Sequence, residues 1–379
     1  MGKSNVRAFE GGVHSISSSP RVLFWKDVIC NHAARIRDLD LAETSKFTLL
    51  VLFGGLQPSS LPLHSLQLRQ STQQDFPTFP IAVVQTYQLQ SLSVTGYEGA
   101  WYSLPFSCLT NLKMHNIPSL PHLEEFIETL RGNPHLQTID MEDSLPSGSE
   151  VMGSIARVNL PKLGSLRLSS TRNPKEVSNI LSCITAPSTA YIEIDCRNRD
   201  SAQDDREALI ELASSLSVFF SAMSNISYDE VYVNATGYSI RLSTLNSCNL
   251  DIRPQKLTID FKTSQCGQEM QHEIFPALPL PSIRKLSLEL DAADILVKET
   301  LWNISYLQVV HLIGNCAFDF VTALVDKPQD YHAQDSAFYS VLFPKLQTLC
   351  ITKTSCGPYG VCPIDFLCAL WSVSIAMLN

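Results

Sequence analysis

The chain has 379 residues, of which 45% are hydrophobic and 17% are charged, so a sizeable core is possible and wholesale disorder is not expected. The formal net charge of -9 lacks the basic excess that nucleic-acid binding usually needs, and we expect no nucleic-acid partner. The eleven cysteines follow no tight spacing framework, which favours a reduced, intracellular protein of the cytoplasm or nucleus.

The N-terminal region lacks the features of a targeting segment. Residues 1–20 are polar, contain no apolar signal-peptide core and are expected to form a flexible tail. The longest apolar stretches, residues 49–56 and 367–378, are too short to span a bilayer. We therefore expect no membrane partner.

The pattern apolar-x-x-Leu-x-Leu, in which x is any residue and another apolar residue can replace either Leu, recurs along the chain. Copies lie at residues 36–41, 63–68, 89–94, 109–114, 136–141, 163–168, 283–288, 307–312 and 346–351, with a looser copy ending at 194. The central apolar residues of the first seven copies lie 20 to 27 residues apart, and leucine-rich repeats have periods of roughly 20–29 residues. This repetition predicts a leucine-rich-repeat protein.

The alternation within each repeat predicts one short strand. Leu39 and Leu41 would point inward while Asp38 and Asp40 point outward. A single short strand cannot bury its apolar face, but neighbouring strands stacked in parallel can do so, and each parallel connection needs a return element. The predicted fold is therefore an α/β leucine-rich-repeat solenoid, a horseshoe with a parallel sheet on the concave face and helices on the convex face.

The segments between the strands supply the return elements. Residues 24–34 and 120–130 have helical apolar periodicity, and residues 174–184 repeat it behind a proline suited to the first helical turn. Short polar residues follow most repeat strands at the third position after the last apolar residue, among them Ser144 and Thr171. Such side chains bond nearby backbone groups at turns and helix starts.

The region 198–282 is less regular. Residues 204–223 predict a longer amphipathic helix, and residues 231–233 and 257–259 predict degenerate repeat strands. A domain break near residue 200 is the alternative to a continuous array. Because the repeat pattern resumes afterwards, we favour one solenoid.

The predicted solenoid covers residues 21–379. Its last segment, residues 364–373, has a helical pattern, whereas residues 374–379 make a poor polar cap. Solenoids need capped ends, so we expect the C-terminal cap to be either truncated or covered by a partner.

No catalytic signature is present, and we expect neither an enzyme nor a cofactor. Cys350, Cys356, Cys362 and Cys368 are spaced six apart, whereas zinc ligands usually come in pairs separated by two to four residues. The spacing does not favour a metal site.

The outward positions of the predicted strands are the candidate binding surface, because solenoids bind partners on their concave face. The candidate partner-binding residues are Asp38, Asp40, Gln67, Arg69, Asn111, Lys113, Thr138, Asp140, Glu142, Arg167, Glu193, Asp195 and Glu289, with Ser91, Ser93, Ser165 and Ser287 among them. The alternative is that these are ordinary solvated side chains. Both charge signs occur in this set, so the sequence does not define the charge of a ligand.

Five segments carry a resemblance to a known family. They are residues 35–41 (RIRDLDL), 109–118 (LTNLKMHNIP), 136–143 (LQTIDMED), 160–168 (LPKLGSLRL) and 186–196 (APSTAYIEIDC). They resemble the C-terminal region of leucine-rich-repeat F-box proteins of mushroom-forming fungi, over roughly residues 21–355. The resemblance implies that the repeats hold a protein substrate for an SCF-type ubiquitin ligase. No F-box precedes residue 24, so binding of the ligase adaptor is expected only if an F-box is supplied elsewhere.

The leading hypothesis is an intracellular protein-binding solenoid related to ubiquitin-ligase substrate receptors. A repeat scaffold without a ligase connection is one alternative. An extracellular ligand-sensing repeat protein is another, based on the cysteine count and on sequons at Asn225, Asn234 and Asn303. An enzyme is a third, based only on the late cysteine series.

Overall fold

The computed structural model describes residues 4–9, 20–42, 45–70, 77–98, 106–119, 122–146, 156–171, 173–196, 204–223, 230–234, 239–243, 256–261, 273–280, 283–289, 304, 306–313 and 345–352. The chain has a mixed α/β fold that divides into two compact units, Met1–Ala190 and Tyr191–Asn379. The boundary between the units lies near residue 200. A domain break at this position was the alternative to a continuous array in the sequence analysis.

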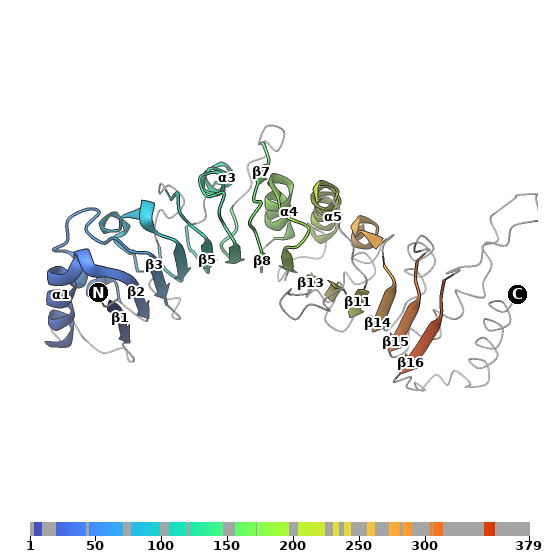
Figure 1. The fold of residues 1–379 in the computed structure, drawn as a ribbon, viewed down its shortest axis with the longest axis horizontal. Coiled ribbons are helices and arrows are strands. Elements are labelled where there is room, and N and C mark those ends of the chain that lie inside the picture. The colour runs from blue at the N-terminus through green and yellow to red at the C-terminus, as the bar shows by residue number, and fades with distance from the viewer. Residues whose placement is uncertain are drawn as a thin grey trace, which may run out of the picture. The chain divides into compact units, whose positions relative to one another are not determined.

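Unit 1 contains a parallel sheet of seven strands (Figure 1). The strands are β1 (Ser4–Phe9), β2 (Ile36–Ala42), β3 (Ser65–Arg69), β4 (Ser91–Thr95), β5 (Asn111–His115), β6 (Thr138–Glu142) and β8 (Ser165–Ser170). They lie side by side in chain order, and each is parallel to the next. The predicted parallel sheet is confirmed in this unit. β1 differs from the sequence prediction, which assigned residues 1–20 to a flexible tail.

The inward side chains of these strands form two apolar ladders. One contains Leu39, Leu66, Leu92, Leu112, Ile139 and Leu166, and the other contains Leu41, Leu68, Val94, Met114, Met141 and Leu168. Each of these side chains is at most 2% exposed. Burial of one such side chain contributes about 1.5–3 kcal/mol. Because each strand is covered by its neighbours in the ladder, the sheet forms only when the repeats stack.

Backbone hydrogen bonds set the register at the start of the strands. The His64 carbonyl oxygen accepts from the amides of Gln90 (2.9 Å) and Ser91 (3.0 Å). The Gln90 carbonyl accepts in the same way from Thr110 (2.8 Å) and Asn111 (3.0 Å). Repetition of one backbone pattern explains why side chains at equivalent repeat positions lie opposite one another.

At the strand ends the chain turns through a left-handed residue. Gly96, Asn116 and Asp143 directly follow β4, β5 and β6 and have φ values of 68°, 51° and 49°. Gly, Asn and Asp are the residues that adopt this conformation most readily. A Cβ atom at Gly96 would lie 2.6 Å from the Gln70 carbonyl oxygen, so this glycine is required by space as well as by φ.

We expect Gly96→Ala to lower the free energy of unfolding by about 1–3 kcal/mol, since it combines left-handed strain with a backbone clash. Gly164→Ala is the matched control, because its Cβ would lie 3.6 Å from the Gln137 carbonyl oxygen, an ordinary contact. Urea denaturation of the two variants measures the difference. Equal stability of the two variants would contradict the role given to the Gly96 turn.

The helices of unit 1 are α1 (Pro20–His32), α2 (Lys46–Phe53), α3 (Leu123–Arg131) and α4 (Pro174–Cys183). α3 and α4 lie on the same side of the sheet (Figure 1). α4 begins as predicted, with Pro174 in the first turn and the Asn173 side chain accepting from the Lys175 amide at 2.8 Å. Between β3 and β4 the chain forms 3-10 helices, η2 (Ile81–Val83) and η3 (Thr86–Gln88). Two short strands, β7 (Val158–Asn159) and β9 (Ile184–Thr185), pair in parallel and form a separate two-stranded sheet.

Unit 2 contains β10 (Tyr191–Cys196), β11 (Glu230–Asn234), β12 (Ser239–Ser243), β13 (Lys256–Phe261), β14 (Lys285–Glu289), β15 (Val309–Ile313) and β16 (Thr348–Thr352). Their order is β10-β13-β12-β11-β14-β15-β16. The predicted helix is present as α5 (Asp204–Ala222). The apolar side chains at helical spacing along the predicted segment 204–223 are buried, namely Leu209, Leu212, Leu216, Phe219 and Met223.

The prediction of a parallel sheet is wrong in the middle of unit 2. β12 was not predicted, and it is antiparallel to both β11 and β13. Only residues 235–238 connect β11 to β12, and a parallel crossover needs a dozen or more residues. So short a connection allows only a hairpin. The sequence signal was available, because Ile240 and Leu242 alternate with polar residues.

Among the helices in the described part of the chain, none has the length and apolar character needed to cross a membrane. The helix predicted for residues 364–373 lies outside the described residues.

Candidate functional site

The outward face of the unit 1 sheet carries polar side chains in three rows. The strand register aligns Asp38, Ser65, Ser91, Asn111, Thr138 and Ser165 in the first row, and Asp40, Gln67, Ser93, Lys113, Asp140 and Arg167 in the second. The third row contains Ala42, Arg69, Thr95, His115, Glu142 and Ser169. Every candidate residue that the sequence predicted within unit 1 lies in these rows, and each is half-buried or exposed.

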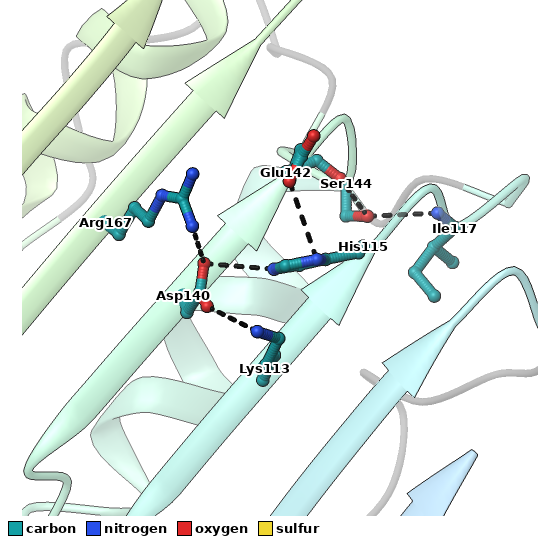
Figure 2. A network of polar contacts seen from close by, with 7 residues as sticks. All are labelled: Lys113, His115, Ile117, Asp140, Glu142, Ser144 and Arg167. Atoms are coloured by element: carbon teal, nitrogen blue, oxygen red, sulfur yellow. Dashed lines mark hydrogen bonds and ion pairs between the residues drawn. The ribbon is translucent and has the colours of Figure 1, made fainter. Parts of the chain in front are cut away.

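A network of polar contacts occupies one part of this face, over β5, β6 and β8 (Figure 2). The Asp140 carboxylate is its centre. His115 Nε2 donates to Asp140 Oδ1 at 3.0 Å, and Lys113 Nζ lies 3.0 Å from Asp140 Oδ2. Arg167 approaches from the other side, with Nη1 4.0 Å from Asp140 Oδ1. One carboxylate therefore links side chains from three strands that are up to 54 residues apart in sequence.

His115 also connects the network to the third row. Its Nδ1 lies 3.6 Å from Glu142 Oε2, so the ring lies between two carboxylates. The sequence prediction missed His115, although it follows the last apolar residue of its repeat just as Glu142 does. The same alternation would have identified it.

Partial burial by itself raises the pKa of Asp140. The hydrogen bonds from His115 and Lys113, and the positive charges of these side chains, outweigh burial and lower the pKa from 3.8 to about 2. Asp140 is therefore ionised at neutral pH.

This pKa shift predicts an acid-sensitive contribution to stability. Since the folded-state pKa lies below the unfolded value, the contribution is fully present above about pH 4 and is lost as the pH falls through about 2. We expect Asp140→Asn to be less stable than the parent chain at pH 6, and the difference to shrink between pH 4 and pH 2. Urea denaturation across this range measures it. A difference that stays constant with pH would contradict the assigned network.

The turn after β6 holds the network in place. The buried Ser144 hydroxyl donates to the Glu142 carbonyl oxygen at 2.9 Å and accepts from the Ile117 amide at 3.0 Å (Figure 2). In the same turn, Asp143 Oδ1 accepts from the amide of Thr171, which directly follows β8, at 2.6 Å. Ser144 thus bonds backbone groups at the turn, as the sequence predicted.

A second charged contact lies on β2 and β3. Arg69 Nη2 donates to both carboxylate oxygens of Asp40, each at 3.1 Å. The two residues belong to neighbouring rows, so the guanidinium reaches diagonally across the face. The sequence predicted both residues but did not predict their pairing.

The candidates in unit 2 are placed less uniformly. Glu193 on β10 is half-buried and accepts from the Tyr191 hydroxyl at 2.9 Å. Asp195 was predicted to face outward for binding, but it is only 4% exposed. The neighbouring Ile194 and Cys196 are buried as well, so both faces of this strand end are covered and Asp195 does not lie on an exposed face. Ser287 is buried in the same way, and the side chain of Glu289 lies outside the described residues.

Within the described ranges, no group of three or more His, Cys, Asp or Glu side chains is arranged to hold a metal ion. Cys350 is exposed on β16, whereas Cys356, Cys362 and Cys368 lie outside the described residues. The chemistry of the described face is that of charged and hydroxyl groups held on a rigid sheet.

No protein-family model matches the sequence, and no curated protein is significantly similar to it. The resemblance to F-box leucine-rich-repeat proteins therefore rests on the five sequence segments alone.

Proposed function

We propose that the chain is a leucine-rich-repeat solenoid of horseshoe form that binds another protein on its concave sheet face. By its resemblance to fungal F-box proteins, it would be the substrate-recognition region of an SCF-type ubiquitin-ligase receptor acting in the cytoplasm or nucleus. The ligase adaptor would bind only through an F-box supplied elsewhere. The support for a solenoid is the in-register stacking of the repeats along the unit 1 sheet.

The observation that carries the binding function is the outward face of that sheet. Three rows of mostly polar residues cross β2 to β8, and the strand register sets the spacing between them. Strands and helices hold a binding surface more accurately than loops do. Because such a surface is already ordered, little conformational entropy is lost when a partner binds. A broad polar surface on a rigid sheet is suited to a macromolecular partner.

The test is site-specific photo-crosslinking in fungal cells. A photoreactive amino acid at Ser93, an outward and uncharged position in the second row, is expected to capture a specific protein. The same amino acid at Glu124, exposed on α3, is the control. Mass spectrometry identifies what is bound. Capture at Glu124 but not at Ser93 would exclude the sheet face as the binding surface.

The same experiment separates the two intracellular hypotheses. Recovery of the ubiquitin-ligase adaptor together with the captured protein would support the ligase role. Recovery of the captured protein without the adaptor would favour a repeat scaffold that has no ligase connection.

A further inference from the structure

On the unit 1 face, the lysine and arginine side chains that form ion pairs are more exposed than the aspartates that they contact. The side chains of Arg69 and Lys113 are 44% and 45% exposed, and that of Arg167 is 36% exposed. The acids that they contact are covered, with Asp40 at 22% and Asp140 at 15%. The same asymmetry thus occurs in two separate clusters of the face.

The cause is visible in the geometry of the larger cluster. Lys113 and Arg167 reach the Asp140 carboxylate from opposite sides (Figure 2). Long basic side chains keep their charged ends in water while their stems lie on the protein. A short carboxylate on the same surface is covered by the groups that bind it.

The two remaining acids of the face do not reverse this pattern. Glu142 lies between His115 and Ser169 in the third row, and its side chain is 33% exposed. Asp38 is half-buried at the far end of the first row. Between β3 and β6 the second row is otherwise neutral, with Gln67 and Ser93. A partner that approaches this area meets ammonium and guanidinium groups first, although the chain as a whole has a net charge of -9.

We propose that the outward face of the unit 1 sheet, from β3 to β8, binds an extended acidic segment of a partner protein. This inference rests on the proposed function and specifies the chemistry of the partner. Acidic side chains of the partner would contact Arg69 at one end and the Lys113 and Arg167 pair at the other. The hydroxyl and amide groups between them would bond the partner's backbone.

The strand spacing sets the distance between acidic groups. Lys113 and Arg167 converge over Asp140 on β6, three strands from β3. Neighbouring strands lie about 4.8 Å apart, so the two cationic sites are separated by about 14 Å or slightly more. An extended peptide advances about 3.3 Å per residue. The preferred segment therefore has acidic residues four positions apart, an even spacing that places both side chains on the same face of the extended peptide.

The test uses labelled peptides and the full chain, with binding measured by fluorescence anisotropy at low salt. One ten-residue Ser/Thr-rich peptide carries Glu at positions 3 and 7, a second carries Glu at positions 3 and 4, and a third carries Lys at positions 3 and 7. The protein variants are Arg69→Gln with Lys113→Gln, and a charge-matched control, Lys46→Gln with Lys162→Gln. Both control residues are exposed outside the face, and circular dichroism verifies the fold of each variant.

We expect the peptide with Glu at positions 3 and 7 to bind best, and its affinity to fall as salt is added. Loss of Arg69 and Lys113 should weaken binding about tenfold, while the control double variant should change it less than about twofold. Equal binding by all variants, or tighter binding of the lysine peptide, would overturn the proposal. Displacement of the peptide by a lower concentration of oligothymidylate would also overturn it, because the face would then favour nucleic acid.

The crosslinking experiment keeps this inference distinct from the proposed function. If a protein is captured at Ser93 but the acidic peptides do not bind, only the inference about partner chemistry fails. If nothing is captured at Ser93 and the peptides do not bind, the proposed binding face fails as well.

Discussion

Replacing Asn133 by alanine is expected to lower the free energy of unfolding by about 3–4 kcal/mol, because it leaves several buried backbone groups without a partner. Asn133 is fully buried just after α3. Its Oδ1 accepts from the Leu109 amide at 2.9 Å. Its Nδ2 donates to the carbonyl oxygens of Phe106 (3.1 Å) and Thr129 (2.7 Å). One side chain thus joins the end of a helix to the segment that precedes β5.

The matched control is Asn111→Ala. Asn111 is exposed on β5, so its replacement should change stability by less than about 0.5 kcal/mol. Urea denaturation gives the magnitudes, and hydrogen–deuterium exchange shows where protection is lost. We expect the loss in the Asn133 variant at residues 106–136. If the two variants were equally stable, the buried amide would not be the link between these repeats.

Replacing Phe126 by alanine is expected to lower the free energy of unfolding by about 3–5 kcal/mol. Phe126 lies on the inward face of α3 and is 0% exposed. Its removal would leave a cavity beneath the helix, since the surrounding side chains relax only partly.

Phe47→Ala makes the same chemical change at a different site. Phe47 lies on α2 and is 51% exposed, so little packing is lost, and we expect less than about 1 kcal/mol. Thermal unfolding of both variants at one pH provides the comparison. If the Phe47 variant were as unstable as the Phe126 variant, the loss of stability would not depend on how deeply each phenylalanine is buried.

Predictions from hydrophobic periodicity were confirmed in unit 1, where the leucine pattern repeats at regular intervals. The period of the leucine pattern predicted the parallel strands of unit 1, because alternate apolar side chains need neighbouring strands for burial. The apolar face of α3 and the proline that starts α4 were also predicted. These features depend on local spacing, which a sequence displays directly.

Other features of the fold depend on connection length or on context. The antiparallel β12 was not predicted because it does not carry the repeat pattern, although a four-residue connection excludes a parallel return. Asn133 lies in the segment Gly132-Asn133-Pro134, whose residue types predict the end of a helix but not the hydrogen bonds of the buried amide. Its role depends on carbonyl and amide groups that approach it from other parts of the chain, and no local pattern reports them.

The candidate face illustrates the same division. Sequence alternation by itself determined which residues of unit 1 point outward, since successive side chains of a strand lie on opposite faces. Only the tertiary structure decided that Asp140 is covered while Lys113 and Arg167 stay exposed, and that Asp195 is buried. Exposure and pairing depend on which side chains meet across strands more than twenty residues apart, and the distances between them arise only when the repeats stack.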